Sequence, residues 1–319
     1  MKLVIQIPCL NEEKYLPITY NDLPKNISGI DEIEVLVIDD GSSDNTYSVA
    51  KDLGVNRIVK FKSHKGLARA FTAGLSAALD MGADIIVNTD ADNQYCAKDI
   101  EKLIEPILNQ RADIVIGTRP VDKIKDFSMT KKILQKLGSC IIRFFSSTKV
   151  KDAPSGFRAF SRNAAIQLNV FDKYTYTMET IIQAGAKDLN IECVDINVNP
   201  SLRKSRLFAN MFLYIIHSII TTFRMFIVYR PFRFFAILGA ISIFIGVLLG
   251  IRFLYLYSHG EGRGHIQSLI LTSIFILSGV QIGLFAVLAE VVSINRKLLE
   301  DIQKRVKLYG LKKNSDDLK

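Results

Sequence analysis

The sequence predicts an α/β fold with a doubly wound, mostly parallel sheet, followed by interfacial amphipathic helices and a transmembrane hairpin of two helices. Short apolar runs alternate with helix-like runs over roughly the first two hundred residues. A basic, apolar segment follows, and after it come two long stretches without any charge. We therefore expect a globular domain at 1–200, juxtamembrane helices at 201–232, two membrane spans within 233–292 and a basic cytoplasmic tail at 293–319.

Five runs in the first part have the composition of β-strands, because they are short, rich in β-branched residues and bounded by turn residues. They are KLVIQIP (2–8), EIEVLVIDD (32–40), NRIVKF (56–61), ADIIVNTD (83–90) and ADIVIGTR (112–119). Helix-like runs lie between them at 45–53, 67–81 and 98–110. This alternation is typical of a parallel sheet with helices on both faces.

The composition indicates a membrane protein in its second part. The 319 residues are 49% hydrophobic, with a mean hydropathy of +0.20. The runs 234–251 and 266–289 carry no charge, and each is long enough to cross about 30 Å of hydrocarbon as a helix. Both are apolar all round, which disfavours the alternative of two buried core helices. The chain starts directly with a strand pattern, so no secretory signal is expected, and its four scattered cysteines favour a reducing compartment.

Positive charge is concentrated just before the first span. The net charge is +9, and the segment 201–233 contains no acidic residue. Its basic residues are Arg203, Lys204, Arg206, Arg224, Arg230 and Arg233. Because aliphatic and aromatic residues interleave with them, we expect a helix at the membrane interface rather than a nucleic-acid site. Arg296 and Lys297 follow the second span, so the positive-inside rule places both termini and the globular domain in the cytoplasm.

Polar residues follow four of the predicted strands at their carboxyl ends. The clusters are Asn11 and Glu12, then DDGSSDNT (39–46), then Lys65 and Gly66, then NTDADNQY (88–95). In the second cluster Gly41 permits a tight turn, and Ser42 or Ser43 can cap the next helix. The Lys65–Gly66 loop can approach a phosphate. Ligands bind outside the carboxyl ends of strands in such sheets, so the four clusters together predict a nucleotide site.

Asp90 and Asp92 end the fourth strand on either side of the small Ala91. In extended backbone their carboxylates point to the same side. Two adjacent carboxylates repel unless a positive charge lies between them, so the pair favours a divalent-cation site. The alternative is an ordinary strand-to-helix turn in which Asp92 caps the next helix.

The order of these motifs, PxxNE, DDGSxDxT, a Lys-Gly loop and DxD, resembles the family 2 glycosyltransferases with the GT-A fold. The resemblance covers roughly the first two hundred residues. It implies that Asp90 and Asp92 bind Mg²⁺ or Mn²⁺ on the diphosphate of a nucleotide-sugar donor. The residues that it implies for binding the nucleotide-sugar are Pro8, Asn11, Glu12, Asp39, Asp40, Lys65, Gly66, Asp90 and Ala91.

A narrower resemblance is to the polyprenyl-phosphate glycosyltransferases, which include dolichyl-phosphate mannose synthases and undecaprenyl-phosphate sugar transferases. It is carried by DAD with Gln94, by GTR, by DAPSGFR (152–158) and by RKSR (203–206). It implies that Gln94 joins the metal ligands, that Asp152 points towards the donor sugar and that Gly156 relieves the backbone. The residues that it implies for the acceptor phosphate are Arg119, Ser155, Arg158, Arg203 and Arg206. One departure is Asn93-Gln94-Tyr95, where relatives often have Leu-Gln-His.

Glu179 has two interpretations on sequence grounds. It lies at the start of a helix-like run, where a carboxylate favours the helix dipole. In the broader family a carboxylate in this setting is the general base. Asp152 and Glu179 are therefore the candidate catalytic residues.

The expected function is inverting transfer of a sugar from a UDP- or GDP-linked donor to undecaprenyl or dolichyl phosphate at the cytoplasmic membrane face. The alternatives are transfer to a lipid-linked sugar or lipid hydroxyl, and a non-catalytic nucleotide-sugar-binding scaffold. A processive polysaccharide synthase is disfavoured, since that group carries QxxRW and this chain has no Trp. Leu298, Leu299, Ile302 and Val306 in the helix-like run 295–311 could bind a second copy in a homo-oligomer.

Overall fold

The computed structural model describes residues 1–120, 150–170, 176–200, 220, 223–224, 227–260 and 266–316. The chain divides into two units. The first comprises Met1–Thr222 together with Lys304–Lys319, and the second comprises Phe223–Gln303.

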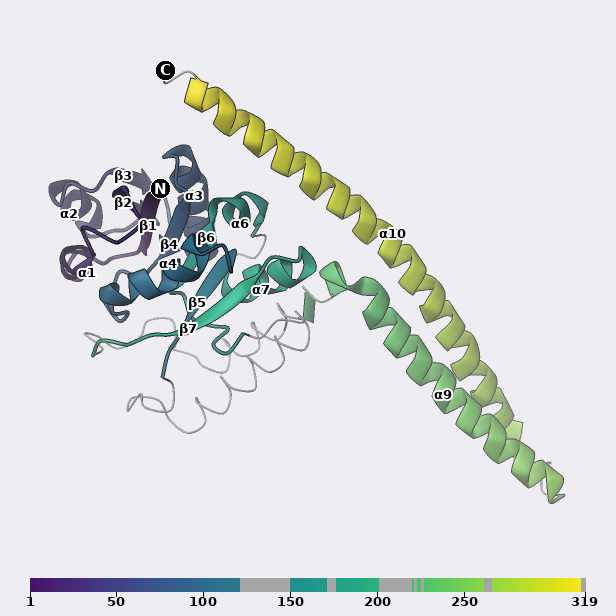
Figure 1. Ribbon diagram of the computed structural model, residues 1–319. Helices are drawn as coiled ribbons and strands as arrows, with labels where there is room; N and C mark the ends of the chain where they lie inside the picture. The colour runs from purple at the N-terminus through teal and green to yellow at the C-terminus, as the bar shows by residue number, and fades with distance from the viewer. Residues whose placement is uncertain are drawn as a thin grey trace. The chain divides into compact units, whose positions relative to one another are not determined.

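The first unit is an α/β domain (Figure 1). Its strands are β1 (Lys2–Cys9), β2 (Glu32–Asp39), β3 (Arg57–Lys60), β4 (Ile85–Asn88), β5 (Ile114–Thr118), β6 (Arg158–Ser161) and β7 (Ile191–Asp195). Its helices are α1 (Leu16–Asp22), α2 (Thr46–Asp52), α3 (Leu67–Asp80), the 3₁₀ turn η1 (Ala97–Asp99), α4 (Ile100–Leu108), α6 (Arg162–Gln167) and α7 (Thr177–Ala186). All five predicted strands and all three predicted helical runs are confirmed, with ends that differ by a few residues.

The strands form one sheet in the order β3-β2-β1-β4-β6-β5-β7. Every pair is parallel except β4–β6 and β5–β6, where β6 runs antiparallel to both neighbours. The expected mostly parallel sheet is therefore confirmed. The strands β6 and β7 were not predicted from the sequence, because RAFS and IECVD are short and carry charged residues.

Helices cover both faces of the sheet, as expected for a doubly wound fold. One face carries a core in which β1, β2 and β4 residues pack with residues of α1, α2 and α4. The other face carries α3, where Phe71 meets Phe160 of β6 at a ring distance of 5.5 Å. The central strands are buried on both faces, which explains their nearly continuous apolar sequences.

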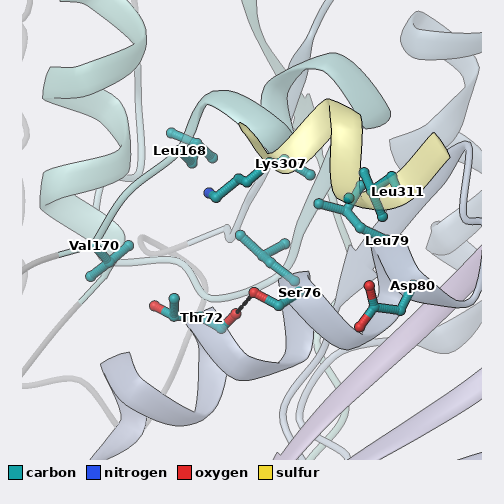
Figure 2. A pocket seen from close by; sticks show the side chains of 11 residues that line it. Thr72, Ser76, Leu79, Asp80, Leu168, Val170, Lys307 and Leu311 are labelled. Carbon is teal, nitrogen blue, oxygen red and sulfur yellow. Dashed lines mark hydrogen bonds between the residues drawn. The ribbon is translucent and has the colours of Figure 1, made fainter. Parts of the chain in front are cut away.

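The last turns of the chain's final helix, α10 (Ile266–Asp316), pack on the outer face of α3 and the segment after α6. Lys307 donates from Nζ to Asn169 Oδ1 at 3.0 Å and to the Ile166 carbonyl at 3.3 Å. Figure 2 shows the Lys307 side chain reaching towards Leu168, and Leu311 lying beside Leu79 of α3; both Lys307 and Leu311 line a small pocket of about 210 Å³. The basic tail therefore continues as ordered helix, and the expected boundary at 293 lies inside α10.

The second unit consists mainly of α9 (Pro231–Ser258) and the earlier part of α10. Both helices are long and apolar enough to cross a membrane, and few of their span residues are buried. Small residues line their contact: Ser242 Oγ donates to the Phe275 carbonyl at 2.8 Å. A β-carbon at Gly239 or Gly279 would lie about 3 Å from the backbone of the facing helix. Close approach at small residues is how helices associate in lipid, so the two helices fit a transmembrane hairpin.

Most of the expected juxtamembrane helix, including Arg203 and Arg206, lies outside the described residues. Leu298, Leu299, Ile302 and Val306 are exposed on α10. Homo-oligomer formation stays a prediction.

A fold prediction concerns Gly74, inside α3. A β-carbon there would come within 2.4 Å of Gln6 Oε1 and 2.9 Å of Ile38 Cδ1. Gln6 is fully buried and its amide bonds to Asn88 at 2.8 Å, so it cannot swing away. We expect Gly74→Ala to reduce the free energy of unfolding by about 1–3 kcal/mol, despite the better helix propensity of alanine.

The matched control is Gly310→Ala in α10, where the new methyl group meets nothing within 4 Å. Thermal unfolding of the full chain in detergent should show a lower Tm for Gly74→Ala and an equal or slightly higher Tm for the control. Equal shifts in the two variants would contradict the packing argument.

Candidate active site

The carboxyl ends of β1 to β4 meet at one edge of the sheet. Their register places Cys9 beside Asp39, and Asp39 beside Lys60. Gln6 of β1 pairs with Asn88 at the end of β4. Since β5 is antiparallel to β6, which is antiparallel to β4, the end of β5 lies at this edge too. The fold therefore brings the four predicted polar clusters and Arg119 to the same side of the domain.

The loops after β1 and β2 bind each other tightly. Asn11 adopts a left-handed conformation at φ 55° and its N–H donates to Ser42 Oγ at 2.9 Å. The Asn11 side-chain oxygen in turn accepts from the Ser43 N–H at 2.8 Å. The Glu12 N–H donates to Thr46 Oγ1 at 2.8 Å. The expectation that Ser42 or Ser43 caps α2 is wrong, because both are engaged with Asn11; the N-cap is Asn45.

Asp39 is the buried carboxylate at the centre of this edge. Its Oδ1 accepts from the Ser42 N–H at 2.9 Å, whereas its buried Oδ2 has no hydrogen-bond partner within the described chain. A buried carboxylate oxygen normally accepts a hydrogen bond. A base N–H or a ribose hydroxyl would supply one, so the geometry fits the predicted role of Asp39.

Asp40 faces the opposite way, towards the loop after β3. It accepts from the Lys65 N–H at 2.7 Å and from the Gly66 N–H at 2.9 Å, and its Oδ2 lies 2.8 Å from His64 Nδ1. These contacts favour a role in shaping the Lys65–Gly66 loop. No pattern in the sequence indicated this division between two neighbouring aspartates.

Gly41 makes that loop arrangement possible. It has φ 73°, and a β-carbon would lie only 2.5 Å from the carbonyl carbon of Ser63. The predicted tight turn is confirmed, and the glycine also lets the two loops approach. Pro8 is buried in β1. The pairing of β1 with β4 ends at Gln6, before Pro8, so the N–H that proline lacks is not needed for a hydrogen bond to β4.

The expectation of extended backbone through Asp90 and Asp92 is wrong. The strand β4 ends at Asn88, a turn follows at Ala91 and Asp92, and Asn93 is left-handed at φ 54°. The helix-cap alternative for Asp92 is also wrong, because the caps of η1 and α4 are Cys96 and Asp99. Exposure still alternates: Asp90, Asp92 and Gln94 are partly exposed, whereas Ala91, Asn93 and Tyr95 are buried.

Neighbouring segments fix this turn from two sides. Thr19 Oγ1 of α1 donates to the Ala91 carbonyl at 2.8 Å, and Asn93 Nδ2 donates to Asp22 at 2.7 Å. On the other side the Asn199 N–H donates to the Gln94 carbonyl at 2.8 Å. Ala91 therefore lies in the core, and its carbonyl is already bonded. No pattern in the sequence pointed to Thr19, Asp22 or Asn199.

The residues of this turn fit a divalent metal. Carboxylate and amide oxygens are the hard ligands that Mg²⁺ and Mn²⁺ prefer, and Asp90, Asp92 and Gln94 offer them. Across the described ranges no three His, Cys, Asp or Glu side chains gather into a ligand set. A metal here would therefore depend on phosphate and water oxygens to complete its shell, as Mg²⁺ at nucleotide sites usually does.

Gly156 lies beneath Asp90. A β-carbon on Gly156 would be 3.3 Å from both carboxylate oxygens of Asp90 and 3.2 Å from the Tyr176 hydroxyl. Its φ is outside the left-handed region, so the expected relief of backbone strain is wrong. Glycine is needed here for space.

Two tyrosines close to Asp90 stay protonated. Burial, and next the negative charge of Asp90, raises the pKa of Tyr95 to about 12. Burial followed by Asp90 also raises the pKa of Tyr176 well above its usual value. Both hydroxyls therefore keep their protons at neutral pH.

Arg119 and Asp152 form a two-pronged ion pair at the end of β5. Arg119 Nε donates to Asp152 Oδ2 at 2.8 Å, and Nη2 donates to Oδ1 at 3.0 Å. Burial alone would lower the pKa of Arg119, but the charge of Asp152, the hydrogen bond to it and the charge of Asp90 raise it. The Arg119 side chain is 18% exposed, and Nη1 makes no hydrogen bond to any described residue. Within the described part of the chain, a permanently charged nitrogen thus remains available near the aspartates.

Arg158 and Ser155, the two other predicted phosphate contacts of this region, are both buried. Arg158 is fully buried and donates to the carbonyls of Ser155, Thr177 and Ala153 and to Thr180 Oγ1. These bonds tie the 153–155 loop to α7, so they favour a structural role for Arg158 over a phosphate contact. Ser155 is buried too, and its Oγ has no hydrogen-bond partner within the described residues.

Glu179 is fully buried in the first turn of α7. Its Oε1 accepts from Gln183 Nε2 at 3.2 Å, and Gln183 also bonds to Asn169. Both interpretations of Glu179, general base and dipole partner, stay predictions.

A site prediction follows from the two loops that meet at Gly41. Gly41→Ala should push the Lys65–Gly66 loop away and weaken UDP or GDP binding by about tenfold or more. The control is Gly54→Ala, which shares a positive φ of 70° but meets nothing within 4 Å. Calorimetric titration of both variants should show the loss for Gly41→Ala alone. Equal nucleotide affinities in the two variants would contradict the argument that the two loops approach closely at Gly41.

Comparisons with known proteins identify the family of this chain. A model of glycosyl transferase family 2 matches residues 4–168. A UDP-N-acetylglucosamine–dolichyl-phosphate N-acetylglucosaminyltransferase of Methanococcus voltae is 34% identical over 60% of this chain and 82% of that relative. An undecaprenyl-phosphate mannosyltransferase of Micrococcus luteus is 30% identical over 62% of this chain and 83% of that relative.

The crystal structure of glucosyl-3-phosphoglycerate synthase from Mycobacterium tuberculosis with Mn²⁺, UDP-glucose and phosphoglyceric acid matches with a TM-score of 0.57. It is 19% identical and covers 70% of this chain and 79% of that chain, so the likeness is one of fold. The expected GT-A fold is confirmed, and the chain belongs to glycosyl transferase family 2, with polyprenyl-phosphate sugar transferases among its relatives.

Proposed function

We propose that this protein is a metal-dependent, inverting glycosyltransferase that moves a sugar from a UDP- or GDP-linked donor to a polyprenyl phosphate. The observation that carries the proposal is Arg119. Asp152 holds its guanidinium at the sheet edge of Asp90 and Asp92, with Nη1 uncommitted among the described residues. Named relatives that act on dolichyl and undecaprenyl phosphates support the acceptor class.

The donor nucleoside binds at Asp39, whose buried Oδ2 accepts from it. Asp40 accepts hydrogen bonds from the N–H groups of Lys65 and Gly66 and so holds their loop in place to bind the phosphates. Asp90, Asp92 and Gln94 would hold a divalent metal, which would supply positive charge to compensate that of the departing diphosphate. Inversion requires the acceptor oxygen to approach the anomeric carbon from the side opposite that leaving group.

A polyprenyl phosphate is already anionic at neutral pH, so its oxygen can attack without losing a proton to a general base. It needs charge compensation and positioning, which a guanidinium provides well. Arg119 supplies both, and Asp152 acts through it. Arg203 and Arg206 stay in the proposal as further phosphate contacts. A buried Glu179 is compatible with this mechanism, since no proton has to leave the nucleophile.

The membrane helices complete the proposal. The spans in α9 and α10 anchor the enzyme in the cell membrane, with both termini and the catalytic domain in the cytoplasm. The basic segment before α9 holds the site at the interface where a polyprenyl chain lies.

The acceptor prediction compares Arg119→Ala with a surface control, Arg111→Ala, whose side chain is 53% exposed. Removing a buried partner of a phosphate costs on the order of 2–5 kcal/mol, which is about thirtyfold or more in rate. We expect Arg119→Ala to raise the polyprenyl phosphate concentration needed for half-maximal rate by about thirtyfold or more. The affinity for the nucleotide should stay nearly unchanged. Because alanine leaves Asp152 without this ion pair, Arg119→Gln, which keeps a hydrogen bond without the charge, is measured beside it.

The assay titrates polyprenyl phosphate in detergent and follows labelled sugar into the organic phase. Glu179→Gln should lose less activity than either Arg119 variant. If Glu179→Gln is inactive while the Arg119 variants match the parent, the acceptor is a hydroxyl and the proposal is wrong.

The topology prediction uses cysteines placed at Ser258, which ends α9, and at Tyr309, which is 74% exposed on α10. In whole cells an impermeant maleimide should label Ser258→Cys, whereas Tyr309→Cys should react only after lysis. The parent chain, with its native cysteines, serves as the background control. Labelling of Tyr309→Cys from outside would contradict the cytoplasmic placement.

A further inference from the structure

One residue behind the aspartate turn, Gly156, is held through both of its backbone polar groups. The Gly156 N–H donates to the Tyr95 hydroxyl at 3.1 Å. The Gly156 carbonyl accepts from Asn88 Nδ2 at 2.9 Å and from the Tyr176 hydroxyl at 3.2 Å. Asn88, Tyr95 and Tyr176 are all buried, so water cannot easily replace these bonds.

The groups that hold Gly156 are themselves fixed. Asn88 Oδ1 accepts from Gln6 Nε2 at 2.8 Å. The Tyr176 ring stacks on Phe71 at 3.8 Å and 5°, and the Tyr95 ring stacks on Phe157 at 4.9 Å and 9°. Each hydroxyl therefore stands at the end of a ring that has little freedom to move.

This network is connected to the aspartate pair in two ways. Asn88 and Tyr95 lie before and after Asp90 and Asp92 in the sequence, so both ends of the turn attach to Gly156. The bare α-carbon of Gly156 also leaves the space in which the Asp90 carboxylate lies, since a β-carbon added to Gly156 would be only 3.3 Å from it. The same residue thus fixes the turn and leaves the space for its first carboxylate.

We propose that Asn88, Tyr95, Gly156 and Tyr176, here called the Gly156 clamp, set the position of Asp90 for metal binding. The inference rests on the proposed function, in which Asp90 and Asp92 hold a divalent metal. Asn88, Tyr95 and Tyr176 are then positioning residues that act through Gly156. Tyr95 contributes to the clamp through its phenol hydroxyl, which accepts the Gly156 N–H.

The test uses Tyr→Phe variants, which keep the stacked rings and remove only the hydroxyls. Tyr95→Phe leaves the buried Gly156 N–H without its acceptor, and Tyr176→Phe removes one donor to the Gly156 carbonyl. Gly156→Ala adds the methyl group that crowds Asp90. The matched control is Tyr47→Phe on α2, where the exposed ring contacts Lys60.

Mn²⁺ binding to the purified full chain with UDP or GDP is followed by electron paramagnetic resonance, and metal-free nucleotide binding by calorimetry. We expect Tyr95→Phe to weaken Mn²⁺ binding by about threefold to tenfold, Tyr176→Phe by less and Gly156→Ala by more than about tenfold. Metal-free nucleotide affinity should stay within about twofold of the parent, as should every value for Tyr47→Phe.

Unchanged Mn²⁺ affinity in Tyr95→Phe and Gly156→Ala would overturn the clamp, and so would an equal loss of metal-free nucleotide binding, which indicates general damage. Asp90→Ala separates this failure from that of the proposed function. If Asp90→Ala binds Mn²⁺ like the parent, the metal assignment itself fails. If Asp90→Ala loses Mn²⁺ while the clamp variants keep it, only the clamp is wrong.

Discussion

Like charges on one turn are the constraint around which the catalytic unit is organised. Asp90 and Asp92 repel each other, so their turn has to be held by contacts that do not depend on the ligand. Thr19 and Asp22 from α1 and Asn199 after β7 provide such contacts through hydrogen bonds. These partners come from opposite ends of the domain's sequence, so the turn reaches its form only once the whole sheet is assembled. A turn fixed in advance loses little conformational freedom when a metal and diphosphate bind.

Arg119 brings positive charge to the sheet edge that carries Asp90 and Asp92. Its ion pair with Asp152 allows the guanidinium to be placed there. An arginine placed here alone would lose hydration without a partner, which is costly. Asp152 accepts hydrogen bonds from Nε and Nη2 in a bidentate arrangement that also fixes the plane of the guanidinium. The remaining nitrogen, Nη1, makes no hydrogen bond to any described residue. The pair resembles a salt bridge that stabilises the fold, yet its exposed side leaves it suited to recognise phosphate.

The location of the site could be predicted from the sequence, whereas the division of roles within it could not. Parallel strands bring their carboxyl ends together, so motifs after β1 to β4 had to meet. The different directions of Asp39 and Asp40 depend on how the loop after β3 folds back, which no local pattern encodes. The resemblance implied a phosphate contact for Arg158, whereas carbonyls from two segments distant in sequence accept hydrogen bonds from it. Gly156 looked like a turn glycine, although its neighbours rather than its backbone angles require it.

The anchor and the choice of acceptor reinforce each other. A polyprenyl phosphate is confined to the membrane, so an enzyme held there meets it at a far higher effective concentration than an enzyme free in solution. The chain leaves the α/β unit to form the hairpin and returns to it, because Lys304–Lys319 belongs to that unit. Lys307 and Leu311 make this return a packed contact beside α3. The catalytic unit is therefore joined to the membrane helices at two points of the sequence. Because one chain carries both the membrane helices and the site, the enzyme shares its membrane with a lipid phosphate, which favours a lipid acceptor over a soluble one.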